Sequence, residues 1–218
     1  KTVIPIAASD DFIVTEYLDG GGLPDDFFRK FGRQLARLHR HTSPEFGFSE
    51  DNFIGRTLQR NKAEADEKHN WPAFFYNKRL LEQYLLAKKN GYGERLRSAG
   101  FERLQKKIPK IFTDTKEPPA LLHGDLWRGN FLCDTHGDPV LLDPAVYYGH
   151  READIAMTKL FGGFAEDFYD AYDNEYPLSK GWRDRIDLYN LYHLLNHLNM
   201  FGRGYLMEAE AAISKYAR

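Results

Sequence analysis

The sequence predicts an α+β fold in which helices form most of the core and the strands are few and short. Apolar residues recur at helical spacing over most of the 218 residues, whereas β-branched and aromatic runs are confined to the first 18 residues and to one hairpin near the middle. Hydrophobic residues make up 42% and aromatic residues 15% of the chain, which is enough for a sizeable core. The length corresponds to one large domain or two small ones.

Two strands and a helix are predicted at the start of the chain. Residues 3–6 and 12–18 are rich in apolar, β-branched and aromatic residues, and three glycines at 20–22 end the second strand. Residues 41–55, punctuated by Ser, Pro and Gly, predict a loop. The helix between them follows Pro24, and its apolar face consists of Phe27, Phe31, Leu35 and Leu38.

The middle of the chain predicts two helices, a buried strand and a hairpin. The helices cover residues 71–89 and 101–112, and the strand covers 120–122. The hairpin spans 131–142, because two apolar segments flank the turn residues 134–139. Further helices are predicted near 154–161, 165–172 and 183–200 and in the C-terminal tail.

Charge and composition exclude several classes of protein. The 30 Lys and Arg residues against 32 Asp and Glu give a net charge of −2, so no positive excess attracts nucleic acid or an anionic membrane. No apolar run approaches the roughly 20 residues that span a bilayer. Cys133 is the only cysteine, which precludes an internal disulfide and predicts a small buried hydrophobe. We expect a cytoplasmic protein that is a monomer or a weak homodimer.

The most informative segment is His-Gly-Asp-Leu-Trp-Arg-Gly-Asn at residues 123–130. Asn130 precedes the first hairpin strand and Asp143 follows the second, so antiparallel pairing should place them side by side. Asp125 lies five residues before Asn130 on the same loop. Such oxygen ligands suit Mg²⁺, and one carboxylate remains free to accept a proton from a hydroxyl. This division of roles is typical of phosphoryl transfer.

The spacing matches the H-x-D-x-x-x-x-N loop of kinases, in which the Asp acts as base and the Asn as metal ligand. Taken singly, Asp125 and Asn130 could cap turns, and Asp143 before Pro144 could simply end a strand. Their combination at this spacing favours a catalytic role.

Six segments carry a resemblance to a known family: residues 31–39, 51–55, 123–130, 143–154, 161–164 and 188–197. They are similar to the fructosamine kinase (ketosamine kinase) family, which belongs with the aminoglycoside phosphotransferases and choline kinases in the protein-kinase-like fold. The resemblance implies phosphorylation, dependent on ATP and Mg²⁺, of a sugar hydroxyl of ketosamines, either free or protein-bound, as a step in deglycation.

The resemblance also implies roles for the residues of this loop. Asp125 would be the base that accepts the hydroxyl proton, and Asn130 and Asp143 would hold Mg²⁺ against the ATP phosphates. His123 would orient the loop. Trp127 would line the sugar site, although packing under the loop explains an indole there equally well.

Two further assignments depend on the resemblance. Glu16, Tyr17 and Leu18 resemble the hinge whose backbone binds adenine, where the alternative is a plain strand. Asp154 resembles a buried acid that braces the catalytic loop, where the alternative is a helix N-cap. A separate pair, His193 and His197, lies four residues apart on a predicted helix and could share a metal, but no Glu completes an H-E-x-x-H motif and two packed or solvated histidines are favoured.

The sequence departs from the kinase pattern at its start. Residues 1–18 contain no Gly-rich loop followed by a lysine-bearing strand, the two features that position the ATP phosphates. We therefore expect residues 1–19 to be a remnant of the N-terminal lobe and hinge, and residues 20–218 to form the helical C-terminal lobe. We also expect the isolated chain to have little or no kinase activity. An aminoglycoside- or choline-kinase-like enzyme and a catalytically silent binding module remain alternatives.

Overall fold

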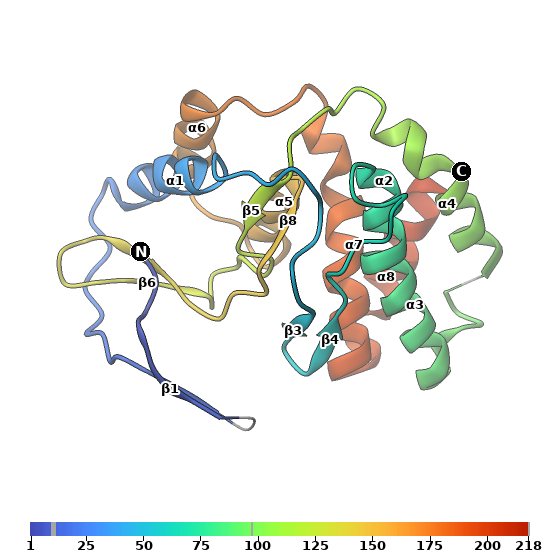
Figure 1. Ribbon diagram of the computed structural model, residues 1–218, viewed down its shortest axis with the longest axis horizontal. Helices are drawn as coiled ribbons and strands as arrows, with labels where there is room; N and C mark the ends of the chain where they lie inside the picture. Colours follow the sequence, from blue (N-terminus) through green and yellow to red (C-terminus); the bar gives the residue numbers. More distant parts are fainter. Residues whose placement is uncertain (10–11, 97, 218) are drawn as a thin grey trace.

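A computed structural model describes residues 1–9, 12–96 and 98–217. The helices form two groups with short strands between them (Figure 1). Each group has its own apolar core, and the segment predicted to carry the chemistry runs between the two. The helical α+β architecture predicted from the sequence is confirmed.

The smaller group packs α1 (Phe27–Leu38) against α6 (Glu166–Glu175). Phe27, Phe31 and Leu35 of α1 are buried, as their helical spacing predicts. The two helices approach so closely that a Cβ added at Gly32 would lie 2.2 Å from the Phe168 carbonyl oxygen. Only glycine permits this contact, which fixes how α1 crosses α6.

The larger group surrounds α7 (Trp182–Phe201), which is buried on most sides. It includes α3 (Glu82–Ala87), α5 (Glu152–Leu160) and α8 (Leu206–Tyr216), which contact α7, and α4 (Ser98–Ile111), which packs on α8. The helix predicted over 71–89 is present, but it alternates between α-helical and π-helical turns. These are α2 (Trp71–Phe74), a π segment at Phe75–Leu81, α3, and a second π segment at Lys88–Tyr92.

In the described part of the chain the strands pair into four two-stranded antiparallel sheets. They are β1 (Pro5–Ala8) with β2 (Ile13–Thr15), β3 (Asn52–Ile54) with β4 (Thr57–Gln59), β5 (Ala120–Leu122) with β8 (Tyr147–Gly149), and β6 (Phe131–Cys133) with β7 (Pro139–Leu141). The predicted hairpin at 131–142 is therefore confirmed.

The predicted loop over 41–55 is wrong at its end, where β3 begins a hairpin. The side-chain amide of Asn52 donates to the Val146 carbonyl at 2.8 Å, and the side-chain amide of Gln59 donates to the Ala145 carbonyl at 2.9 Å. These strands are too short to show a period-2 pattern. Contacts with a segment 90 residues away stabilise them, and local sequence does not report such contacts.

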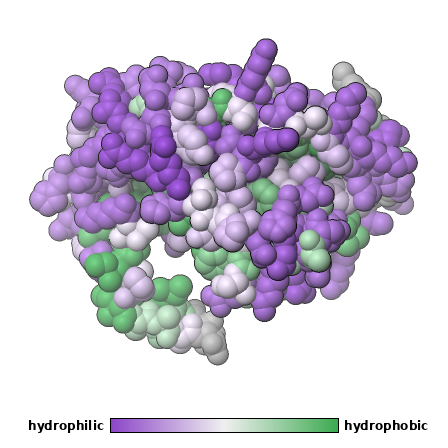
Figure 2. Space-filling view, turned by 45° about the horizontal axis from the view of Figure 1, so that its top comes forward, coloured by the Kyte–Doolittle hydropathy of each residue, from purple (hydrophilic) through white to green (hydrophobic). Residues whose placement is uncertain are grey.

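The first residues lie beside the central hairpin. The Leu141 amide donates to the Lys1 carbonyl at 2.9 Å, and the Lys1 ammonium contacts the Asp134 carboxylate at 2.9 Å. Beyond this contact β1 and β2 project as an arm, with Ile6 67% exposed (Figures 1 and 2). The division at residue 19 stays a prediction. Among the described helices, none combines the length and the apolar character needed to cross a membrane.

Candidate functional site

The polar loop of residues 123–130 connects β5 to β6 and lies against the segment that follows β7. Gly124 makes the turn possible: its φ is +83°, and an added Cβ would lie 2.0 Å from the Ala145 carbonyl oxygen. The Ala145 amide in turn donates to the His123 carbonyl at 2.8 Å. The backbone at the start of the loop is thus in direct contact with the backbone of the segment that follows Asp143.

The carboxylate of Asp154 holds the backbone at the start of the loop. It accepts hydrogen bonds from the backbone amides of His123 at 2.7 Å and Gly124 at 2.9 Å. His39 Nε2 lies 3.1 Å from the same carboxylate, and His39 Nδ1 lies 2.6 Å from the Tyr172 hydroxyl. Burial alone would raise the pKa of Asp154, but the hydrogen bond and charge of His39, with the Gly124 amide, hold it below its usual value.

The alternative assignment of Asp154 as a helix N-cap is wrong. Arg151 occupies the N-cap position of α5, and Asp154 lies within the helix, 1% exposed. Its side chain points out of the helix, toward the loop and α1, because all its partners lie there. The placement as a brace of the loop, expected from the resemblance, agrees with this geometry.

His123 is 2% exposed and bonded on both ring nitrogens. Its Nδ1 accepts from the Asp125 amide at 3.3 Å, and its Nε2 lies 2.8 Å from the Leu142 carbonyl oxygen. Because a carbonyl only accepts, Nε2 carries the proton, which defines the tautomer. Burial lowers the pKa of His123, so a neutral ring connects the loop to the end of β7.

Asp125 and Asn130 are in direct contact. The Asn130 amide nitrogen donates to the Asp125 backbone carbonyl at 2.9 Å and to Asp125 Oδ2 at 3.1 Å. With its nitrogen engaged on this side, Asn130 turns its carbonyl oxygen the other way, available to a ligand. Burial raises the pKa of Asp125 to about 6. The Asn130 hydrogen bond opposes this shift, and the negative charges of Asp154 and Asp143 add to it.

Asp143 follows β7, on the same end of the hairpin as Asn130. The Leu142 amide donates to the Asn130 carbonyl at 2.9 Å, so the two positions are neighbours in register. Asp143 has φ +46°, a conformation that costs energy for residues other than glycine and is tolerated best by Asp and Asn. Its carboxylate is exposed and has no hydrogen-bond or ion-pair partner among the residues that the structure describes.

The predicted donors for Mg²⁺ are therefore an unpaired carboxylate at Asp143 and a free amide oxygen at Asn130. This set fits a hard cation that keeps water ligands and is completed by substrate phosphates. It is too small for a cage built from protein alone, and in the described ranges no cluster of three or more His, Cys, Asp and Glu side chains has the geometry of a metal site.

The predicted hinge lies at the base of the projecting arm. The Glu16 amide donates to the Ile4 carbonyl at 2.9 Å, and the Glu16 carboxylate accepts from the Ile4 amide at 3.0 Å. Tyr17 and Leu18 follow without regular structure, and Tyr17 is 87% exposed. The chain then contacts the central hairpin where the Gly21 amide donates to Cys133. The segment predicted to be the hinge thus leads directly to a contact with the central hairpin, whose first strand follows Asn130.

Aromatic rings continue from Trp127 along the surface beside the loop. Trp127 is half-buried and lies edge-on to Phe161, with ring centroids 5.6 Å apart, and Phe161 is 5.0 Å from His197. Phe201 and Tyr205 extend the row from His197 at 5.4 and 5.0 Å. Trp127 therefore packs against Phe161, as the packing explanation requires, and the part of its surface left open keeps the sugar-site role a prediction.

The two helical histidines do not form a metal pair. His197 Nδ1 lies 2.8 Å from the His193 carbonyl oxygen, whereas His193 Nδ1 faces Asp125. Of the two states that the sequence left open, packed or solvated, the structure shows His193 buried and His197 half-buried. Cys133 is 5% exposed, which confirms the expected small buried residue.

Sequence reasoning missed His39 and Tyr172, and it did not show that His193 faces Asp125. Counted along the sequence from Asp125, His39 at the C-cap of α1 lies 86 positions away, Tyr172 on α6 lies 47 and His193 on α7 lies 68. The sequence offers one signal for such residues, a polar side chain at a helical position that faces the core. This signal does not show which residue the side chain contacts.

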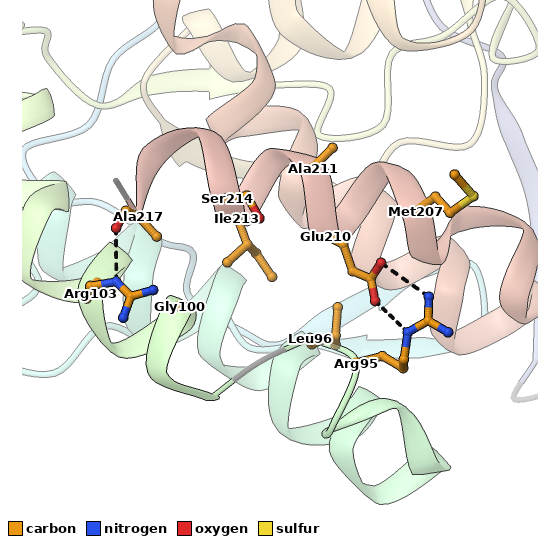
Figure 3. A pocket seen from close by; sticks show the side chains of 10 residues that line it. All are labelled: Arg95, Leu96, Gly100, Arg103, Met207, Glu210, Ala211, Ile213, Ser214 and Ala217. Atoms are coloured by element: carbon orange, nitrogen blue, oxygen red, sulfur yellow. Dashed lines mark hydrogen bonds and ion pairs between the residues drawn. The ribbon is translucent and has the colours of Figure 1, made fainter.

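A pocket away from the loop lies between α4 and α8, with a volume of about 420 Å³ (Figure 3). Its charged side chains are already engaged: Arg95 pairs with Glu210 at 2.9 Å, and Arg103 donates to the Ala217 carbonyl at 3.0 Å. It shares no lining residue with the loop of residues 123–130. We assign it no function.

Comparison with known proteins agrees with this geometry. A relative from Enterococcus faecium named "probable ketoamine kinase" is 44% identical over 188 residues, which are 86% of this chain and 66% of the relative. A chloroplastic protein-ribulosamine 3-kinase of Arabidopsis thaliana is 42% identical over 209 residues, 95% of this chain and 62% of the relative. The chain thus spans about two thirds of the length of these relatives.

Solved structures show the same fold. A crystal structure from Thermobifida fusca, assigned provisionally as a fructosamine-3-kinase, superposes with a TM-score of 0.86 at 32% identity, over 98% of this chain and 73% of that one. An ADP-bound aminoglycoside phosphotransferase superposes with a TM-score of 0.57 at 13% identity, over 100% of this chain and 76% of that one, which shows the protein-kinase-like fold alone. The sequence pattern of the fructosamine kinase family matches residues 2–218. The chain therefore belongs to the fructosamine kinase family.

Proposed function

We propose that this chain carries the catalytic loop and substrate site of a kinase that transfers the γ-phosphoryl group of ATP to a sugar hydroxyl of a ketosamine. The observation that carries the proposal is the loop of residues 123–130, in which Asp125 is held by Asn130 and the backbone is held by Asp154. Membership of the fructosamine kinase family supports the substrate class.

Asp125 is the proposed base. Its carboxylate accepts the proton of the sugar hydroxyl while the hydroxyl oxygen forms its bond to the γ-phosphorus and ADP leaves. Burial raises the pKa of Asp125 to about 6, so the group is ionised near neutral pH and is still a stronger base than an ordinary aspartate. Asn130 keeps one carboxylate oxygen in place during this step.

Asn130 and Asp143 are the proposed ligands of Mg²⁺, which, when bound with ATP, neutralises charge on the phosphates. The Asn130 bond to Asp125 engages the amide nitrogen, so the amide oxygen would be the atom that holds the ion, together with the carboxylate that follows the left-handed backbone of Asp143. Asn130 bonds to Asp125 and its carbonyl accepts from the Leu142 amide, so the base and both metal ligands are connected through the hairpin.

The proposed adenine contact is the backbone of Glu16, Tyr17 and Leu18, and the proposed sugar platform is Trp127. An exposed aromatic face packs well against the apolar face of a sugar ring, and it also attracts the cationic amine of a ketosamine. The row of rings from Trp127 to Tyr205 is the proposed contact surface for the group that carries the sugar, either a free amine or a protein side chain.

Mass spectrometry of a fructosyl-lysine peptide incubated with the protein, ATP and Mg²⁺ tests the proposal. We expect slow addition of one phosphate, because residues 1–18 lack the phosphate-positioning elements, and no addition with Asp125→Asn or with EDTA. Phosphorylation of an aminoglycoside or choline in place of the peptide would assign the related enzyme class instead. Failure to bind Mg²⁺ and ATP together would assign a silent binding module.

A further inference from the structure

Asp125 Oδ1 is buried and has no hydrogen-bond partner in the described part of the chain, although Oδ2 is held by Asn130. His193 Nδ1, on α7, is also buried and without a hydrogen-bond partner there. The two atoms face each other at 3.7 Å. The proposed base thus has one oxygen bound to its own loop and the other directed at a helix 68 positions away in the sequence.

A buried polar atom without a partner is costly, and a buried carboxylate oxygen more so. The separation of 3.7 Å exceeds a typical N–H···O bond of about 2.9 Å by about 0.8 Å, which a small rotation of either side chain can close. Catalytic hydrogen bonds are often long in the free protein and tighten when substrate binds.

His193 is 4% exposed on a helix that forms the centre of the larger core. Burial, with the neighbouring His197, lowers its pKa to about 3, so the ring is neutral at pH 7 and carries a single N–H. Which nitrogen carries it depends on the partner each nitrogen faces. Since Nδ1 faces only a carboxylate oxygen, the proton belongs on Nδ1.

We propose that His193 is a positioning residue that donates its Nδ1–H to Asp125 Oδ1 and thereby aims Oδ2 at the substrate hydroxyl. The proposal deepens the function proposed above, because it takes Asp125 as the base. With Asn130 on one oxygen and His193 on the other, the plane of the carboxylate is fixed from two separate elements of the fold. The helix thus determines the geometry of a loop residue.

The tautomer of His193 tests the contact without any need for turnover. Long-range ¹H–¹⁵N spectra of the histidine-labelled 218-residue chain, assigned with His193→Asn, should show Nδ1–H for His193. In Asp125→Ala that proton should exchange with solvent at least tenfold faster, whereas His150, a buried histidine stacked on Trp71, stays unchanged. A protonated Nε2 in the parent protein, or a His193 signal that Asp125→Ala leaves unmoved, overturns the proposal.

Kinetics on the fructosyl-lysine peptide separate positioning from packing. His193→Leu should lower kcat about 10- to 100-fold with KM within about twofold, because a misplaced base slows the chemical step more than it weakens binding. His193→Asn should recover kcat to within about fivefold, since its amide N–H lies near the place of Nδ1–H. His150→Asn is the matched control, with kcat expected within twofold.

Equal losses in His193→Leu and His193→Asn, or a loss in KM alone, contradict positioning. If no ketosamine is phosphorylated by the parent protein, the proposed function fails while the tautomer result still decides the contact. The two proposals therefore fail in distinguishable ways.

Discussion

Replacing Asp154 by alanine should destabilise the protein more than any other loss of one carboxylate at the site. The side chain is 1% exposed and accepts from the amides of His123 and Gly124, while His39 Nε2 lies 3.1 Å away. Alanine leaves these three donors buried and unpaired, at about 1–3 kcal/mol each. Relief of the desolvation of the carboxylate offsets part of this cost, and we expect a net loss of about 3–5 kcal/mol.

Urea unfolding followed by circular dichroism measures this loss. With an m-value of about 3 kcal/mol/M, the midpoint should fall by about 1 to 2 M at unchanged m. The matched control is Asp173→Ala: this exposed carboxylate accepts one backbone hydrogen bond, from Leu178 at 2.7 Å, and its loss should cost less than about 1 kcal/mol. Equal midpoints for the two variants would refute the role of Asp154 as a buried brace.

The pH dependence gives a second check on the same residue. The pKa of Asp154 lies below its usual value of 3.8 in the folded protein, so the unfolded chain takes up this proton first as the pH falls. The stability contributed by the carboxylate is complete above about pH 5 and decreases below pH 4. The difference between parent and Asp154→Ala should therefore be constant from pH 8 to 5 and shrink in more acidic solution.

Three further predictions concern the loop and its supports. Gly124→Ala should lower the free energy of unfolding in urea by about 3 kcal/mol or more, because the added Cβ would lie 2.0 Å from the Ala145 carbonyl oxygen. The control Gly162→Ala, at φ +88° with open space around it, should cost about 1 kcal/mol, and similar costs for the two variants would contradict the close approach at Gly124. Asp125→Asn should abolish phosphate transfer yet raise the free energy of unfolding at pH 8 by about 1–3 kcal/mol, because the raised pKa of Asp125 means that its ionised form opposes folding. At pH 4 Asp125 is protonated in the folded protein, so a gain in stability that persists undiminished there would contradict the prediction. Arg185→Ala should lower the free energy of unfolding by about 3–5 kcal/mol, because Glu152 stays buried and charged after losing the guanidinium nitrogens that now lie 2.6 and 2.7 Å from its carboxylate oxygens. A thermal midpoint within about 2 °C of the parent would exclude this cost.

The central hairpin and the long helices could be predicted from local sequence. The turn residues between 131–133 and 139–141 and the helical spacing of Phe27, Phe31 and Leu35 identify these elements without tertiary information. The β3–β4 hairpin and β8 could not be predicted. Each strand has three residues, and their pairing is reinforced by amide side chains that reach segments distant in the sequence.

The sequence by itself identified the residues that we propose to carry the chemistry, because Asp125, Asn130 and Asp143 lie on one loop and one hairpin whose local geometry brings them together. Only the tertiary structure decided how they are held. The sequence left Asp154 open as a helix N-cap and did not show what the His193 ring faces, and the packing of α5 and α7 placed both side chains against the loop. The physical reason is that a hairpin is closed by neighbours in the chain, whereas a buried polar contact depends on which helices pack together.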